Sequence, residues 1–534
     1  MVAAPYALSV LALAAAAWAK DSTPVNWGNT TGTSKDPFPT AVGNLGDMGY
    51  GAAPFRAQVD KINASHFDNN RWGVEMRWRP HNAKEDNANS DDIFRNVGAQ
   101  SPYHPADDLF PETNKYLAVP NQCKIKQAHI IHRHGARNPT GLYEKPPGSF
   151  GQKVANLSKE GKLDVSGDLA FLKSWNYSLG QAVLTHQGAQ ELFDSGVRAY
   201  FDYGHLLEHY SHKPVIRTTS QSRMIDSARY WTLGFFGWDA TDKMHLEVLA
   251  EHDGQNNTMQ PKNSCPNADD SDFKLGDKLV AKWQDIYLEA PRKRLQQYFH
   301  GANLTKDDIS SMMIMCPYET VTLGYSEFCK LFTKKEWEHL EYELDMDKQG
   351  SNGFMAPTGR AQGIGYVTEF VSRMKHKQFD GPQSTQNSTL DKQSKYFPLH
   401  QPLYADFTHD SVIVGILTAF NFTQFADWMD PTKPDPSRRF RTSRLTPFGA
   451  RVVLEVLECD GTDYIRVKVN EALLPLHEGQ GCEGRKDGLC KLDDFVGHLE
   501  KHAFEASKFR VACYGKNGTD FTITGPVKNG APEH

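Results

Sequence analysis

The sequence predicts an α/β fold in which a mainly parallel sheet carries an inserted, mainly helical cap. Of the 534 residues, 39% are hydrophobic and 23% are charged, a composition typical of a soluble chain that folds around a large core. Strand-like stretches alternate with long helical ones, which is the pattern of parallel strands joined by crossover helices. A helix-rich stretch from about 255 to 365 interrupts this alternation and is expected to form the cap.

The expected elements follow in chain order. Short apolar stretches rich in β-branched residues predict five strands: 125–132, 215–219, 403–408, 450–457 and 464–469. Apolar residues that recur every three or four positions, or that continue directly from a strand, predict three helices: 184–200, 275–299 and 412–417. Loops after strand ends carry the chemistry in many such sheets, so we expect functional residues there.

The N-terminal region predicts a secreted protein. Residues 1–19 contain an apolar run that finishes Ala17-Trp18-Ala19, a pattern typical of signal-peptide cleavage. Residues 20–100 are rich in Pro, Gly, Asn and Asp without apolar periodicity, as expected for an extended arm. A folded unit should occupy 101–514, with its α/β core at about 120–255 and 366–514, its cap at about 140–185 and 255–365, and a tail at 515–534.

Cysteines and glycosylation sequons agree with secretion. The eight cysteines form no CxxC pair, so they favour disulfides over a zinc site, and their spacing leaves the pairing open. Nine Asn-x-Ser/Thr sequons predict a glycoprotein. Their asparagines are Asn29, Asn63, Asn156, Asn176, Asn256, Asn303, Asn387, Asn421 and Asn517.

The charge balance argues against two classes of partner. Lysine and arginine number 59 against 65 aspartate and glutamate residues, which gives a net charge of −6, and no long basic block occurs. Nucleic acid and anionic membranes are therefore not expected as main partners. No apolar run approaches the roughly 20 residues of a membrane span. Small molecules are the expected partners, and the oligomeric state stays open.

One short stretch predicts phosphate chemistry. Arg133-His134-Gly135-Ala136-Arg137 places two guanidinium groups around one imidazole at the end of the first predicted strand. Arginine is a planar, permanently charged donor suited to phosphate oxygens. Protonation of an imidazole is disfavoured beside such charges, so His134 would remain a nucleophile in mild acid. The alternative for this stretch alone is a basic surface turn.

Two other predicted strands add candidate residues. Arg217 is expected at the end of the second strand and His409-Asp410 at the end of the third, so both could reach the same pocket. They would supply further phosphate donors and a carboxyl group able to protonate a leaving oxygen. Either one by itself would more often be structural.

Together these residues resemble the signatures of a known family. Arg133 to Pro139 with His409-Asp410 is similar to the signature pair of the histidine acid phosphatases, and the flanking sequence is similar to the fungal phytase branch. The similar stretches are 171–180, 217–223, 356–358, 362–366 and 403–410, within a span from about 98 to 514. The resemblance implies a phosphoglycerate-mutase-like sheet domain with a mainly helical cap.

The resemblance also implies a two-step phosphoryl transfer. His134 would attack phosphorus to form a phosphohistidine, and Asp410 would protonate the leaving alkoxide before water hydrolyses the intermediate, with no metal or organic cofactor. The residues expected to hold phosphate oxygens are Arg133, Arg137, Arg217 and His409. Because an aspartic acid has a reference pKa of about 3.9, we expect an acidic optimum.

The family pattern further implies a set of disulfides. The pairs that match here are Cys123–Cys459, Cys265–Cys513, Cys316–Cys329 and Cys482–Cys490. The most N-terminal bridge of that branch has no counterpart, so the arm before Cys123 has no assigned role.

The expected function is that of a secreted acid phosphatase, in the medium or the cell wall, with broad specificity for phosphate monoesters. Dedicated phytases of the branch carry extra lysines just after the nucleophile loop, whereas residues 141–148 hold only Lys145 beside Glu144. A phytase, which acts on inositol hexakisphosphate, is therefore the alternative.

Other classes remain as remote alternatives. His129, His132 and His134 could indicate a metal hydrolase, although no nearby carboxylate completes a site and the arginines would repel a cation. A non-catalytic phosphate-binding glycoprotein is a second alternative. A phosphomutase fits less well, because secretion would separate it from its substrates. Trp175 is expected in the core and Glu191 as an ordinary surface or structural charge.

Overall fold

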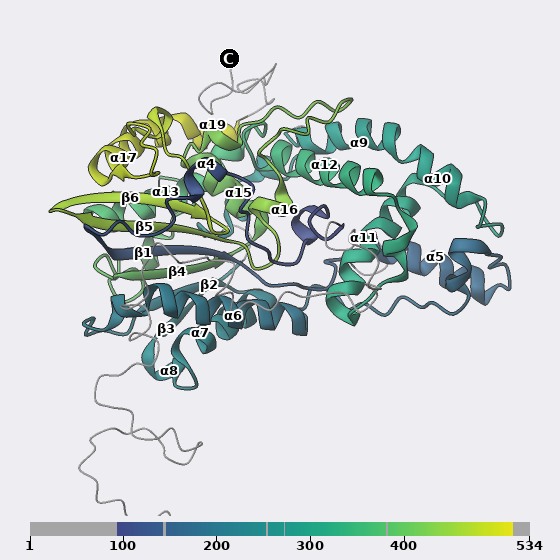
Figure 1. Ribbon diagram of the computed structural model, residues 1–534, viewed down its shortest axis with the longest axis horizontal. Helices are drawn as coiled ribbons and strands as arrows, with labels where there is room; N and C mark the ends of the chain where they lie inside the picture. Colours follow the sequence, from purple (N-terminus) through teal and green to yellow (C-terminus); the bar gives the residue numbers. More distant parts are fainter. Residues whose placement is uncertain (1–92, 142–145, 252–254, 272, 381–382, 516–534) are drawn as a thin grey trace, which may run out of the picture. The chain divides into compact units, whose positions relative to one another are not determined.

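A mixed eight-stranded sheet is the central feature of the described part of the chain (Figure 1). The computed structural model describes residues 93–515 apart from 142–145, 252–254, 272 and 381–382. The predicted signal peptide, most of the predicted arm and nearly all of the tail lie outside these residues. So do the sequon asparagines Asn29, Asn63 and Asn517 and the loop residues Glu144 and Lys145.

The strands run in the order β3-β2-β4-β1-β5-β6-β7, with β8 paired to β6. Their bounds are β1 Cys123–Arg133, β2 Val215–Thr219, β3 His245–Leu249, β4 Leu403–Thr408, β5 Arg451–Cys459, β6 Thr462–Val469, β7 Ala472–Leu473 and β8 Cys490–Lys491. All five predicted strands are therefore confirmed. The short edge strand β3 was missed, because alternating polar residues interrupt its apolar run.

The prediction of a mainly parallel sheet is only half right. Strands β3, β2, β4 and β1 are parallel, but β5 to β8 pair antiparallel. Strands β5 and β6 are joined by a two-residue hairpin, made by Asp460 and Gly461, which have φ values of 51° and 81°. Asp-Gly with both residues in the left-handed region is the preferred tight turn between antiparallel strands. The parallel half carries the candidate site.

Helices cover both faces of the sheet. α6 (His186–Tyr203) and α7 (Ser222–Phe236) pack against one face, whereas α13 (Gly359–Lys375) and α15 (Asp410–Ala419) pack against the other (Figure 1). Successive side chains of a strand alternate between faces, so Ile130 of β1 belongs to the α6–α7 core and Ile131 to the α13–α15 core. The predicted helices 184–200 and 412–417 are confirmed as α6 and α15.

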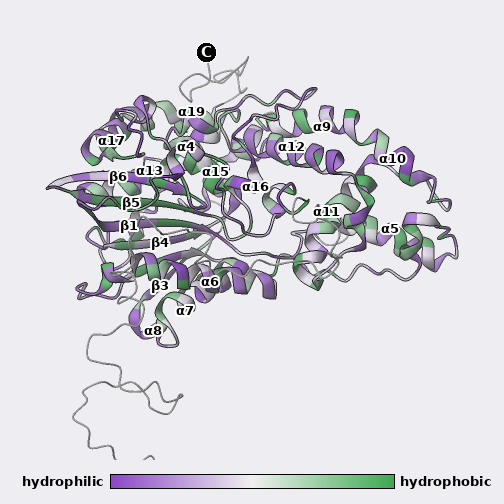
Figure 2. Ribbon diagram, in the orientation of Figure 1, coloured by the Kyte–Doolittle hydropathy of each residue, from purple (hydrophilic) through white to green (hydrophobic). Residues whose placement is uncertain are grey.

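A second group of helices forms the cap. They are α5 Gly148–Lys159, α9 Leu275–Tyr287, α10 Glu289–Gln296, α11 Lys306–Leu323 and α12 Lys334–Ser351. Their apolar sides pack into one hydrophobic core, and their outer sides are hydrophilic (Figure 2). Trp175 packs on Phe328 in this core, with ring centroids 5.2 Å apart, as expected of a core residue. The α/β sheet with a helical cap is thereby confirmed.

The predicted helix 275–299 is two helices, α9 and α10, which meet at Leu288. Pro291 lacks an N–H, so it cannot donate to the carbonyl of Tyr287 four residues earlier, and its ring crowds that carbonyl. The remaining helices are short: α4 Pro111–Asn114, α8 Ala240–Lys243, α14 Ser388–Asp391, α16 Thr442–Leu445, α17 Leu492–His498, α18 Phe504–Ser507 and α19 Phe509–Tyr514. No helix of the described residues is long and apolar enough to cross a membrane.

The described residues form four disulfides, in the pairs that the family resemblance implies. They are Cys123–Cys459, Cys265–Cys513, Cys316–Cys329 and Cys482–Cys490. Cys123 and Cys459 face each other at the ends of β1 and β5, so this disulfide fixes the register of the two strands. Bridges of this kind persist in oxidising compartments.

The described sequons differ in accessibility. Asn156, Asn176 and Asn303 are exposed. Asn421, in contrast, accepts a hydrogen bond from Arg360 and donates one to the carbonyl of Gly479. A glycan on Asn421 would disturb both bonds, so this asparagine is the less suitable acceptor.

Candidate active site

Two loops leave the same edge of the sheet and meet there. Strands β1 and β4 are parallel neighbours, with Arg133 opposite Thr408 at their carboxyl ends. The loop after β1 contains His134, and the loop after β4 contains His409. Their rings meet edge to face with centroids 5.9 Å apart, and the His134 amide donates to the carbonyl of Thr408 over 3.3 Å. The two predicted signatures therefore converge, as expected at the carboxyl ends of parallel strands.

His134 is held in a defined tautomer. Its ring is 1% exposed, and Nδ1 lies 2.8 Å from the carbonyl oxygen of Gly135. Because a carbonyl only accepts hydrogen bonds, Nδ1 carries the proton and Nε2 keeps its lone pair. Burial lowers the pKa of His134 well below its ordinary value, and the charges of Arg133, Arg137 and Arg223 lower it further. The ring therefore stays neutral even in acid, with the Nε2 lone pair free.

Gly135 is required by the close approach of this loop to α6. A Cβ atom at this position would lie 2.3 Å from the carbonyl oxygen of Gly188. Any side chain would push the loop, and with it the neighbouring His134, away from its position.

Three arginines surround the imidazole. Arg133 is 1% exposed, donates to the carbonyls of Ala99 and Thr446, and lies over the ring of Phe448. Burial lowers the pKa of Arg133 and of Arg223 to about 10 in each case, and the charge of Arg137 acts in the same direction. Three cations held together in this way repel one another, so an anion between them would be strongly stabilised.

These arginines also leave donors unused. The Nε–H groups of Arg133, Arg137 and Arg223 are buried without a hydrogen-bond partner among the described residues. A buried donor without a partner is unfavourable by about 1–3 kcal/mol. A phosphate group offers several acceptor oxygens and a double negative charge, so it can satisfy both the donors and the charges.

The prediction that Arg217 binds phosphate is wrong. Its guanidinium forms ion pairs of 2.7 Å with both Asp406 and Glu369, on the α13 face of the sheet. The side chain is 2% exposed and its charge is already balanced. Arg217 lies within β2, whereas Arg223 lies in the first turn of α7, beyond the end of that strand. Arg223, and not Arg217, is therefore among the arginines whose charges act on His134.

His409 is paired with a carboxylate that sequence analysis missed. Its Nε2 lies 2.9 Å from Glu251, directly after β3, and both side chains are buried. Glu251 also accepts from the side-chain amides of Gln221 and Gln260. Burial would raise the pKa of Glu251, but these bonds, with that of His409 foremost, lower it to about 2. Glu251 therefore fixes the orientation of the His409 ring.

Asp410 is the first residue of α15 and faces two cations. Its Oδ2 lies 3.7 Å from Arg133 and 3.8 Å from Lys348 of α12. Burial alone would raise the pKa of Asp410, but Lys348 and Arg133 hold it well below its ordinary value. Lys348 was missed because it lies 62 positions before Asp410 and in no recognisable motif.

Glu191 supports the nucleophile loop from below. It accepts hydrogen bonds from the backbone amide of Ala136 over 2.8 Å and from that of Tyr103 over 3.4 Å. Burial raises the pKa of Glu191 to about 7. Its expected structural role is confirmed, although the structure it supports is the site itself.

The other histidines of β1 do not face His134. His129 stacks on Tyr404 with ring centroids 4.6 Å apart, and His132 is bonded to Ser195 and to the carbonyl of Arg133. Among the described residues, no group of three or more His, Cys, Asp or Glu side chains is placed to hold a metal ion. The metal-hydrolase hypothesis therefore gains no support from these histidines.

Comparisons with known proteins agree with this geometry. Residues 124–470 match the sequence model of the histidine phosphatase superfamily, branch 2. The chain belongs to this family. It is 32% identical to Phytase A of Aspergillus oryzae and 33% identical to Phytase A of Aspergillus awamori, over 75% and 74% of its length and 87% and 86% of theirs. As a histidine phosphatase with such relatives, the protein is a phosphoric monoester hydrolase.

Solved structures show the same fold. The phytase from D. castellii superposes with a TM-score of 0.63 at 21% identity, covering 83% of this chain and 93% of that one. A multiple inositol polyphosphate phosphatase from Bifidobacterium longum, in complex with inositol hexasulfate, superposes with a TM-score of 0.55 at 12% identity, covering 77% and 97%. Both likenesses support the α/β sheet with its helical cap.

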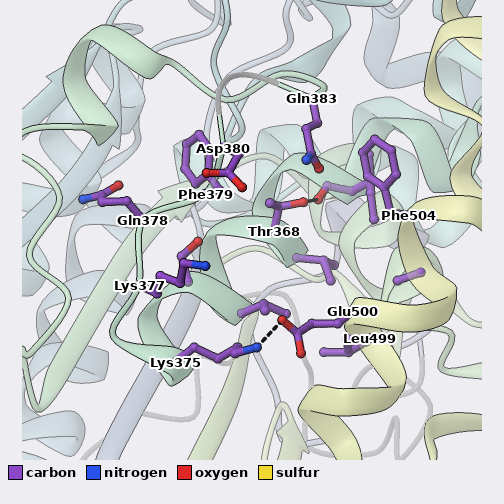
Figure 3. Close-up of a pocket in the computed structure, with 15 residues that line it drawn as sticks. Thr368, Lys375, Lys377, Gln378, Phe379, Asp380, Gln383, Leu499, Glu500 and Phe504 are labelled. Atoms are coloured by element: carbon purple, nitrogen blue, oxygen red, sulfur yellow. Dashed lines mark hydrogen bonds and ion pairs between the residues drawn. The ribbon is translucent and has the colours of Figure 1, made fainter.

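A separate hollow of about 240 Å³ lies at the carboxyl-terminal end of α13, against residues 499–504 (Figure 3). Leu499 and Phe504 line it, and Lys375 pairs with Glu500 over 2.5 Å at its rim. None of the residues around His134 lines this hollow. It is therefore distinct from the phosphate site.

Proposed function

We propose that this histidine phosphatase is a phytase, which removes phosphate from inositol hexakisphosphate. The observation that carries the proposal is the similarity to proteins named Phytase A over about three quarters of the chain. The sequence alone favoured a broad acid phosphatase, because residues 141–148 contain a single lysine. Lys348 weakens that objection, since the cap helix α12 supplies a cation beside Asp410.

His134 is the proposed nucleophile. The free lone pair on Nε2 attacks phosphorus and forms a phosphohistidine, and water then hydrolyses this intermediate. Arg133, Arg137, Arg223 and His409 hold the phosphoryl oxygens and offset the charge that develops in the transition state. The unpartnered Nε–H groups of the three arginines support this role.

Asp410 is the proposed general acid, which must be protonated to serve an alkoxide leaving group. In the free site Lys348 and Arg133 favour its ionised form. A bound phosphate dianion neutralises these same cations, and it also repels a carboxylate. Substrate binding therefore raises the pKa of Asp410. The carboxyl group is then protonated and can donate its proton to the leaving alkoxide oxygen.

We also propose that the protein is a secreted glycoprotein, with the catalytic unit at 101–514 and the cap at about 140–185 and 255–365. The four disulfides fit an oxidising compartment. The exposed sequons Asn156, Asn176 and Asn303 support glycosylation. The separate hydrophobic core of α5 and α9 to α12 supports the division into sheet domain and cap.

The test compares initial rates of phosphate release from phytate and from an aryl phosphate, at mildly acidic pH and with a chelator present. A phytase gives the higher kcat/KM with phytate, and His134→Ala abolishes turnover of both substrates. Brisk aryl phosphate turnover without phytate turnover would instead support a general acid phosphatase. Activity that disappears with chelator and returns with metal would contradict the phosphohistidine mechanism.

A further inference from the structure

Tyr318 is a cap residue that reaches the phosphate site. It lies in α11, which belongs to the cap, and its side chain is 5% exposed. Its hydroxyl oxygen accepts a hydrogen bond from Nη1 of Arg137 over 3.3 Å. The guanidinium of Arg137 also lies over the Tyr318 ring, 5.9 Å from its centroid. The hydroxyl therefore lies beside Arg137, one of the three arginines whose charges lower the pKa of His134.

The Tyr318 hydroxyl donates no hydrogen bond to any described residue. Because the oxygen accepts from Arg137, the O–H bond points away from that guanidinium. The contact with Arg137 is the one hydrogen bond that the Tyr318 hydroxyl makes to a described residue. A buried O–H without an acceptor is unfavourable, and the same region already holds three arginine Nε–H groups without partners. The Tyr318 O–H is therefore a further donor, beside Arg137, that donates to no described residue.

We propose that the Tyr318 hydroxyl donates a hydrogen bond directly to the phosphate that His134 attacks, as an uncharged donor supplied by the cap. This inference rests on the proposed phosphate site at His134, and extends it to a residue outside both sequence signatures. A neutral donor binds the phosphate oxygen without adding to the repulsion among the arginines. It also makes phosphate binding depend on the position of α11, so the cap takes part in binding the scissile group.

The first test is the variant Tyr318→Phe, which removes only the hydroxyl. The inhibition constant of inorganic phosphate, measured against an aryl phosphate substrate, should rise about tenfold, as expected for one lost hydrogen bond to a charged oxygen. The matched control is Tyr287→Phe, another buried cap tyrosine, whose hydroxyl binds Glu343 instead. The control should leave the phosphate inhibition constant unchanged. A Tyr318→Phe value within twofold of wild type would overturn the proposal.

A double-mutant cycle separates direct donation from an effect through Arg137. In an Arg137→Met background, a hydroxyl that contacts phosphate still matters, so adding Tyr318→Phe weakens phosphate binding further. If the second substitution has no effect in that background, Tyr318 acts only by holding Arg137, and the proposal is wrong. Phosphate binding is measured as the rise in Tm that phosphate causes in His134→Ala protein. This readout requires no turnover, so it stays valid even if phytate proves not to be a substrate.

Discussion

Arg217 and Arg223 lie six positions apart, but their guanidinium groups serve different parts of the molecule. Arg217 forms ion pairs with Asp406 and Glu369 on the α13 face of the sheet, in a fully buried network that also includes Arg373. Arg223 lies in the first turn of α7, where its charge acts on His134. Substitution by alanine should therefore lower the stability of the fold at Arg217 and weaken substrate binding at Arg223.

We expect Arg217→Ala to destabilise the fold by about 3–5 kcal/mol, because it leaves buried Glu369 without its cation and buried Asp406 with Arg373 alone. The fraction of the Arg217→Ala variant that still folds should have a KM for an aryl phosphate near that of wild type. Arg223→Ala should leave the free energy of unfolding almost unchanged and raise KM about tenfold or more. Urea unfolding and steady-state kinetics on both variants measure these effects. If KM rose in Arg217→Ala but not in Arg223→Ala, Arg217 would bind phosphate after all, as the sequence predicted.

Sequence analysis identified those site residues that stand in contiguous motifs. His134, Arg137 and Asp410 follow strand ends, so a local pattern could find them. Arg217 was chosen because it lies in a predicted strand, but a side chain in mid-strand faces a covering helix rather than the sheet edge. Glu251 and Tyr318 belong to no motif, since their roles depend on tertiary contacts over 158 and 181 positions.

Helix α12 connects the cap to Asp410, the proposed general acid. Lys348 lies in the last turn of α12, and Asp410 opens α15. The amino-terminal end of a helix favours a negative charge, and Lys348 favours it further. The ionised form of Asp410 is thus stabilised from two elements, one of them in the cap.

We expect Lys348→Met to shift the alkaline limb of the pH–rate profile upward by about one pH unit with an alkyl phosphate. Without this cation the pKa of Asp410 rises, so the acid stays protonated to higher pH. Lys335→Met is the control, since Lys335 is exposed at the other end of α12. An unchanged limb combined with a higher KM would mean that Lys348 only attracts substrate.

Element prediction succeeded where the pattern was long or fully buried. Strands β2 and β4 are buried along their whole length, and their β-branched and aromatic residues marked them in the sequence. The direction of β5 and β6 was missed although Asp460-Gly461 marks a tight hairpin. Pro291 likewise marked the division of α9 from α10. In both cases glycine or proline, rather than hydrophobic periodicity, indicated where the chain turns or a helix ends.

Buried carboxyl groups across the whole molecule predict how its stability varies with pH. Burial raises the pKa of Glu191, Glu247 and Glu343 to about 7 and that of Asp391 to about 8. A raised pKa contributes stability that is full below the ordinary carboxyl pKa and is lost as pH rises through the raised value. Glu251 and Glu455, held near 2 by their partners, contribute stability that is lost only as pH falls toward that value.

We therefore expect the highest Tm at about pH 5, where both sets of groups are in their favoured forms, and a clear decline toward about pH 8. Calorimetry across this range measures the effect. Glu343→Gln tests the cause, because a glutamine mimics the protonated carboxyl that accepts from Tyr287 and Gln284. The variant should lose less Tm than wild type between about pH 5 and 8. If the wild-type Tm were equal or higher at about pH 8 than at about pH 5, these carboxyl groups would not control the stability. An acidic optimum of activity would then depend on the residues around His134 alone.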